Sequence, residues 1–255
     1  MIMLKSEYEY RLMKKAGEIL AKTMNHIALL VQPGETMDKI DDAARLYMQG
    51  HQAMPSFLGL YQYPYTICAS VNNEVIHGFP VKEKKLLEGD IVSIDMGCCF
   101  EGYHADMAYT FPVGKISSSR KKLLETTKTC LKKAIAVAIC GARIGDIGHA
   151  VQEFAESKGF SVVRDYTGHG IGSSVHEEPQ VPNFGEKGRG MALRSGMALA
   201  IEPMINHGQP YVKSLPDRWT VVTKDGSDSA HFEHTVFIKE SGTEILTDLN
   251  QGGSA

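Results

Sequence analysis

The chain has 255 residues, of which 43% are hydrophobic and 22% are charged, and its formal net charge is -3 at pH 7. This composition is typical of a globular protein, and because no basic run stands out we expect no nucleic-acid partner. The N-terminal residues show no long apolar stretch and no cleavage pattern, so we expect neither a signal peptide nor a membrane span. Five cysteines without a CxxC pair favour reduced thiols, and therefore a cytoplasmic protein, over a disulfide framework.

The first half of the chain predicts two helices followed by strands. Apolar residues recur with helical spacing from about residue 6 to 30, and Ser6 with Glu9 three positions later forms a plausible capping box. Pro33-Gly34 ends this helix, and a second helix follows over about 36–48. Runs with a β-rich composition come next.

The second half repeats this order. Helical patterns cover about 117–140 and 146–158, Gly141 interrupts them, and β-rich runs follow. Two helices followed by strands, twice in one chain, predict the α+β fold class. We expect residues 250–255 to form a disordered tail.

Two short segments of the chain are near copies. Segment 89–95 (GDIVSID) lines up with segment 196–202 (GMALAIE), 107 residues further on, and both end on a carboxylate. A duplicated fold whose copies each contribute an acid to a shared midline is a natural cage for metal ions. We therefore expect a single domain, residues 1–255, built of two pseudo-equivalent halves at about 6–115 and 116–248.

The stretch 91–111 predicts a β-hairpin. With the turn centred on Phe100-Glu101, Asp95 faces Asp106 directly. Because side chains alternate across a strand, one face of this hairpin is apolar and the other is small, polar and acidic. Two opposed carboxylates repel each other, and a divalent cation between them would remove that penalty.

The second half supplies three more candidate ligands. Glu202 lies on a strand-like run at 198–205, Glu233 lies on another at 231–239, and His169 stands between two glycines. Taken singly, each acid is more often a solvated surface residue than a ligand, and a lone histidine is weaker still. Only the joint pattern of duplication and matched acids points to a metal site.

Six segments together carry a family resemblance that covers about residues 6–248. The chain resembles the type I methionine aminopeptidases, whose pita-bread fold is shared with prolidases and creatinase. The resemblance implies a pseudo-two-fold antiparallel sheet covered by helices and a single catalytic domain. The segments are SIDMG (93–97), YHADMA (103–108), GHGIG (168–172), HEEP (176–179), IEP (201–203) and EHT (233–235).

The resemblance also implies a site with two divalent metal ions, whether Co, Mn, Fe or Zn. Asp106 and Glu233 would bridge the ions, Asp95 would bind one of them, and His169 and Glu202 would bind the other. Four carboxylates and one imidazole independently suit Mn, Fe or Co better than a metal that prefers thiolates. A hydroxide between the ions would attack the peptide carbonyl, with Glu202 as the proton shuttle.

The resemblance assigns further residues to the substrate. His77 and His176 occupy corresponding places in the two halves, and would bind the substrate amide and stabilise the tetrahedral intermediate. Five residues would line or flank a pocket for the methionine side chain, although core packing explains each of them equally well. They are Tyr63, Cys68 and Trp219, with Phe57 and Leu60 nearby.

This pocket departs from the familiar bacterial pattern at three positions. Phe57, Leu60 and Val175 stand where Cys, Tyr and Phe are often found. The changes affect the predicted shape of the pocket and leave the predicted chemistry unaltered.

The expected function is metal-dependent removal of the initiator methionine from nascent polypeptides, before a small second residue, by a monomeric protein. A prolidase or Xaa-Pro peptidase is the alternative within the fold, but such enzymes normally carry an extra N-terminal domain, and only 94 residues precede Asp95. Type II methionine aminopeptidases usually carry an insert between the positions of His169 and Glu202, which only 32 residues separate here. A non-catalytic binding module on this fold would be expected to have lost metal ligands, whereas all five candidate ligands are present here.

Overall fold

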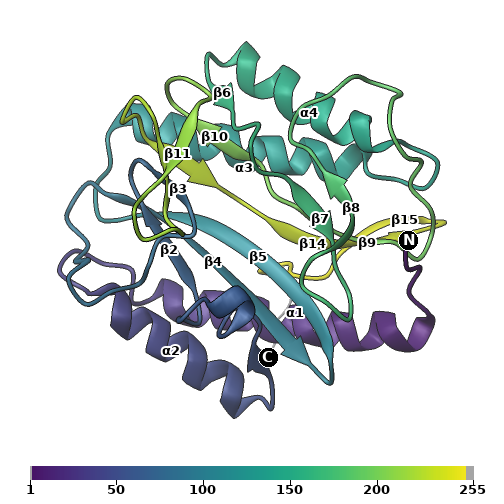
Figure 1. The fold of residues 1–255 in the computed structure, drawn as a ribbon, viewed down its shortest axis with the longest axis horizontal. Coiled ribbons are helices and arrows are strands. Elements are labelled where there is room, and N and C mark those ends of the chain that lie inside the picture. The colour runs from purple at the N-terminus through teal and green to yellow at the C-terminus, as the bar shows by residue number, and fades with distance from the viewer. Residues whose placement is uncertain (1, 251–255) are drawn as a thin grey trace.

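Two pairs of helices enclose the strands from opposite sides (Figure 1). The computed structural model describes residues 2–250, so residues 251–255 of the expected tail lie outside the described residues. None of the described helices is long and apolar enough to cross a membrane. The helices are α1 (Glu7–Ala28), α2 (Met37–Gly50), α3 (Ser118–Val137) and α4 (Ile144–Ser157), with a short 3-10 turn, η1 (Leu60–Gln62).

Within the described residues the strands form four antiparallel sheets, which confirms the predicted α+β class. In one sheet β4 pairs with β5 on one side and with β1 and β2 on the other, and a five-stranded sheet has the order β15-β14-β9-β7-β8. The smaller sheets have the orders β13-β10-β6 and β11-β12-β3. The strands are β1 (Met54–Pro55), β2 (Cys68–Val71), β3 (Glu74–Ile76), β4 (Ile91–Phe100), β5 (Tyr103–Pro112), β6 (Ser161–Val162), β7 (Gly168–Gly170), β8 (Glu177–Val181), β9 (Ala198–Ile201), β10 (Met204–Asn206), β11 (Val212–Ser214), β12 (Val221–Thr223), β13 (Ser229–His231), β14 (His234–Lys239) and β15 (Gly242–Ile245).

The predicted helix signals match the observed helix ends closely. The Glu9 amide donates to the Ser6 hydroxyl at 3.4 Å, and the Ser6 amide donates to the Glu9 carboxylate at 2.7 Å, so the capping box at the start of α1 is present. Each helix pair covers its own apolar core. One core joins α1 and α2 to β4 and β5, and the other joins α3 and α4 to β9 and β14.

The register of the β4–β5 hairpin differs from the prediction. Phe100 pairs with Tyr103, so Asp106 faces Gly97 and Asp95 faces Ala108. The turn therefore falls on Glu101-Gly102, where both residues have positive φ, as a two-residue hairpin turn requires. The predicted register is shifted by two residues, an even number. Asp95 and Asp106 therefore still share a face, as diagonal neighbours.

The strands that carry Glu202 and Glu233 are also not continuous as predicted. Glu202 lies in the gap between β9 and β10, and Glu233 lies in the gap between β13 and β14. Pro203 lacks the amide proton that a continuous ladder needs, so the strands change partners here. β9 pairs with β14 on one side of this crossing, and β10 pairs with β13 on the other.

The two halves are joined where β5 meets the crossing. The Glu233 amide donates to the Ala108 carbonyl at 2.9 Å. The Thr235 hydroxyl bonds both the amide and the carbonyl of Asp106, each at 2.8 Å. These bonds hold Asp106, from the first half, beside Glu233, from the second.

Candidate metal centre

A cavity of about 540 Å³ opens at this junction, and it brings together all twelve residues predicted above for metal binding, catalysis and the pocket. The predicted residues that line it are Phe57, Leu60, Tyr63, Cys68, His77, Asp95, Asp106, His169, His176, Glu202, Trp219 and Glu233.

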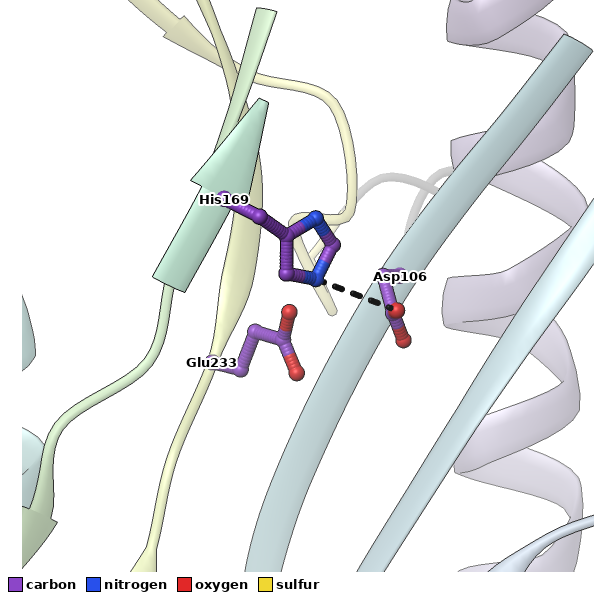
Figure 2. Close-up of side chains that lie close together, drawn as sticks. All are labelled: Asp106, His169 and Glu233. Carbon is purple, nitrogen blue, oxygen red and sulfur yellow. Dashed lines mark ion pairs between the residues drawn. The ribbon is translucent and has the colours of Figure 1, made fainter. Parts of the chain in front are cut away.

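The five candidate ligands reach the cavity from three strands and two connections between strands. Asp95 and Asp106 come from β4 and β5, His169 comes from β7, and Glu202 and Glu233 come from the gaps after β9 and before β14. Figure 2 shows the side chains of Asp106, His169 and Glu233 pointing toward one another. Candidate ligands from distant parts of the chain thus meet at one cavity.

The glycines beside His169 are required by close backbone approaches. A Cβ atom on Gly168 would lie 2.3 Å from the Ala200 carbonyl oxygen, and one on Gly170 would lie 2.2 Å from the Glu178 carbonyl oxygen. Strand β7 is therefore pressed between β8 and β9, and this packing fixes His169 at the cavity.

The separations between the candidate ligand atoms suit a bound cation. One ligand atom from each of Asp106, His169 and Glu233 lies within 4.8 Å of the others. His169 Nε2 is 3.9 Å from Asp106 Oδ2 and 3.5 Å from Glu202 Oε1. These atoms are too far apart for direct hydrogen bonds but close enough to share an ion.

Among the described residues that line the cavity, three buried carboxylate oxygens have no hydrogen-bond partner. They are Asp95 Oδ1, Asp106 Oδ1 and Glu233 Oε1. Buried polar atoms are normally paired, and a cation would satisfy all three. The donor set of oxygens and one imidazole nitrogen fits a hard or borderline divalent metal.

The electrostatics of the carboxylates also favour a bound cation. Burial, together with repulsion from neighbouring carboxylates, raises the pKa of Asp95, Glu202 and Glu233 well above the usual range. Burial raises the pKa of Asp106 to about 7. No lysine or arginine is among the described residues that line the cavity, so a cation from outside the chain is what would favour the ionised form of these carboxylates.

The histidines in the cavity are held in the neutral form. Burial lowers the pKa of His169 to about 4, and burial with the nearby His176 lowers that of His77 to about 4. Burial also lowers the pKa of His176, whose ring centroid is 4.5 Å from that of His169. A neutral imidazole can bind a metal through one nitrogen or donate an N–H to a substrate.

Aromatic and sulfur-containing side chains form one wall of the cavity. The Tyr63 ring lies edge-on to Trp219 with centroids 4.9 Å apart, and the Tyr63 hydroxyl donates to the Ile67 carbonyl at 2.9 Å. Phe57, Cys68 and Val175 complete the same small apolar cluster, and Leu60 packs against it. Of the three residues that depart from the bacterial pattern, Phe57 and Leu60 line the cavity, and Val175 belongs to the apolar cluster that includes Phe57.

Sequence reasoning missed some residues of the site. Tyr61, which stacks on His176 with centroids 5.8 Å apart, and Tyr166 and Gln180 also line the cavity. His231 lies within 4.0 Å of Glu202 and Glu233. Its position two residues before Glu233 on a predicted strand was a usable signal, because such residues share a face. Tyr61 lies in the irregular turn Leu60–Gln62 and gave no comparable signal.

Comparison with known proteins identifies the class. Residues 11–240 match the model of metallopeptidase family M24. The chain is 53% identical to a methionine aminopeptidase of Clostridium perfringens and 47% identical to methionine aminopeptidase 1 of Bacillus subtilis, and each match covers 97% of this chain and 99% of the relative. The chain therefore belongs to metallopeptidase family M24, and the predicted resemblance to its methionine aminopeptidases is confirmed.

Solved structures agree with this assignment. The crystal structure of a methionine aminopeptidase from Thermotoga maritima superimposes with a TM-score of 0.96 at 45% identity, covering 97% of this chain and 100% of that one. The prolidase from Pyrococcus horikoshii gives a TM-score of 0.76 at 23% identity, covering 96% of this chain and 63% of that one, which shows a common fold. Membership of a metallopeptidase family supports the prediction of divalent metal ions.

Proposed function

We propose that the protein removes the N-terminal methionine from nascent polypeptides and peptides by metal-dependent hydrolysis. One observation carries this proposal: five candidate ligands and an apolar pocket converge on a single cavity in a chain of the M24 family. High identity to methionine aminopeptidases over nearly the whole chain supports methionine as the residue removed.

The proposed metal centre would hold two divalent ions. Asp106 and Glu233 would be shared by both ions, Asp95 would hold one, and His169 and Glu202 would hold the other. When ionised, the four carboxylates would carry four negative charges in a buried cavity without lysine or arginine among its described lining residues, and two divalent cations would balance them with four positive charges. Oxygen-rich ligands favour Mn, Fe or Co.

Bound metal ions would supply an activated water and a Lewis acid for the peptide carbonyl. The remaining steps belong to side chains of the protein. Glu202 accepts a proton from the attacking water and passes it to the amine that leaves. His77 and His176, neutral and buried in the cavity, donate N–H groups to the substrate amide and to the developing oxyanion.

Selection of the substrate follows from charge and shape. The acidic cavity attracts a free terminal amine. The methionine thioether lies against Tyr63, Trp219 and Cys68, where contacts between sulfur and aromatic rings are favourable. Phe57 and Leu60 narrow the same pocket, so a long unbranched side chain fits best.

The proposal places the protein among nascent chains in the cytoplasm, as a monomer. Its five cysteines are all free, in agreement with a reducing compartment. Its macromolecular partners are then the N-termini of new polypeptides.

The experiment that tests this function measures release of the first residue from Met-Ala-Ser, Ala-Pro and Gly-Pro peptides. The protein is first treated with a chelator and then assayed with no metal or with added Mn, Fe or Co. We expect methionine release only from Met-Ala-Ser and only with metal. Cleavage of the Xaa-Pro peptides in preference to Met-Ala-Ser would instead identify a prolidase-like activity.

A further inference from the structure

His231 is a fully buried histidine whose ring has no hydrogen-bond partner. Neither Nδ1 nor Nε2 is bonded to any described residue. Nearly all buried polar groups in native proteins are paired, and an orphaned side chain calls for an explanation. Both ring nitrogens are therefore free to interact with a neighbouring group.

The backbone of His231 is held firmly. Its amide donates to the Thr110 hydroxyl at 2.9 Å, and its carbonyl accepts from the same hydroxyl at 2.7 Å. Met204 pairs with it across β10 and β13. This support fixes where the ring projects, as a functional side chain requires.

The ring faces the Glu202 carboxylate. Its Nε2 is 3.8 Å from Glu202 Oε2 and 4.0 Å from Glu233 Oε2. The other Glu202 oxygen, Oε1, lies 3.5 Å from Nε2 of His169. The carboxylate is therefore flanked by two imidazoles, one at each oxygen.

Only one of these imidazoles is able to donate to Glu202. Nδ1 of His169 lies 2.8 Å from the Gly170 carbonyl oxygen, which only accepts, so Nδ1 carries the proton. Nε2 of His169 then carries a lone pair, which can bind a metal ion, and has no proton to donate in a hydrogen bond. His231 has no such commitment, and its Nε2 can carry the proton.

We propose that His231 is a positioning residue that donates its Nε2–H to Glu202 Oε2 and fixes the rotation of that carboxylate. The separation of 3.8 Å exceeds a hydrogen bond by about 0.8 Å, and hydrogen bonds of this kind often tighten only in the working complex. A fixed rotation keeps Oε1 toward His169 and the ion. This inference rests on the proposed role of Glu202 in proton transfer.

His231 is not proposed as a metal ligand. All five proposed ligands line the cavity, and His231 is not among the described residues that line it. A residue that acts only through Glu202 should affect turnover more than metal content. This difference separates the two roles experimentally.

The test compares His231→Leu with His231→Gln, which keeps an N–H donor of similar reach. For each variant and the wild type we would measure kcat and KM on Met-Ala-Ser, bound metal and Tm. We expect His231→Leu to lower kcat about 10- to 100-fold, the usual worth of a hydrogen bond to a charged group, with KM and metal content within about twofold. We expect His231→Gln to stay within about fivefold of the wild-type kcat.

Three results would overturn the inference. The first is a wild-type kcat in His231→Leu. The second is an equal loss of kcat and Tm in both variants, which would indicate a packing role. The third is a loss of bound metal in His231→Leu, which would indicate a ligand. A wild-type protein that releases no methionine with metal would instead refute the proposed function itself.

Discussion

At the scale of single residues, the buried carboxylates are the most demanding feature of the molecule. Asp95, Asp106 and Glu233 each keep an oxygen without a partner in the described structure. Such groups destabilise a fold unless a ligand compensates for them. Their cost is therefore the strongest residue-level argument that the cavity evolved to bind cations.

Replacement of a proposed bridging ligand should abolish both metal binding and hydrolysis. In Asp106→Asn or Glu233→Gln, one shared carboxylate is lost, so both ions should bind more weakly. The variant should nevertheless fold, because removing a charge from a crowded acidic site relieves repulsion. Bound metal by elemental analysis and methionine release from Met-Ala-Ser are the measurements. Normal turnover at full metal content in either variant would contradict the assignment.

His176 should behave differently, because we propose that it contacts the reacting carbonyl rather than the metal. We expect His176→Ala to slow kcat by about 10²- to 10³-fold, which corresponds to about 3–4 kcal/mol for a lost oxyanion donor. Metal content should stay at the wild-type level. A parallel fall of metal and activity would make His176 a ligand or a structural residue instead.

At the scale of elements, the hairpin and the strand crossing show what a sequence pattern can and cannot predict. The acidic face of β4 and β5 was predicted although the register was wrong, because a shift by an even number of residues keeps each side chain on its face. The turn itself depends on the φ angles at Glu101 and Gly102, which alternation does not specify. The breaks beside Glu202 and Glu233 arise from strand pairing between distant segments.

A second element-scale feature is the attachment of the last hairpin to α1. Glu244 on β15 accepts hydrogen bonds from Lys14 at 2.9 Å and Tyr10 at 2.8 Å on α1, and from Lys239 on β14. Burial acts to raise the pKa of Glu244, but these hydrogen bonds outweigh it and lower the pKa to about 2.

This lowered pKa predicts a specific acid sensitivity. The carboxylate contributes stability above its unfolded pKa of about 4.5, and that contribution is lost as the pH falls from about 4.5 toward 2. Glu244→Gln should therefore lower Tm by about 2–4 °C at pH 7, a modest effect because exposure weakens the ion pairs. Near pH 3 the decrease in Tm should be smaller, because part of the contribution of the carboxylate is already lost. Thermal melts of both proteins across this pH range are the check. An unchanged difference in Tm at pH 7 and pH 3 would contradict the assignment.

At the scale of the whole molecule, the duplication explains why so much of the site was predictable. Repetition at a fixed offset marked Asp95 and Glu202 as equivalent before any packing was known. The closeness of His169 to Glu202 could be implied only by resemblance, because it depends on how β7 packs against β9. His231 was not predicted, because a single histidine on a predicted strand does not by itself indicate a functional role.

The whole cavity should also set the specificity. We expect cleavage of Met-Ala, Met-Gly, Met-Ser and Met-Thr peptides with a free amine, and little cleavage of acetylated Met-Ala. Leu-Ala should be slower because the branched chain fits the pocket around Tyr63 and Trp219 poorly, although one methylene changes fit by only about 1–3 kcal/mol. Rates on this panel are the measurement. Equal rates on Met-Ala and Leu-Ala would refute methionine specificity, and efficient cleavage of Met-Lys or Met-Phe would refute the preference for a small second residue.

The most direct test of the central claim is anomalous diffraction from crystals of the protein soaked with manganese. The proposed site predicts two manganese peaks about 3.5–4 Å apart, as in two-metal hydrolases, with Asp106 and Glu233 contacting both. Asp95 should contact one of these ions, and His169 and Glu202 should contact the other. A single peak, or peaks at residues other than these five, would contradict the proposed dinuclear centre.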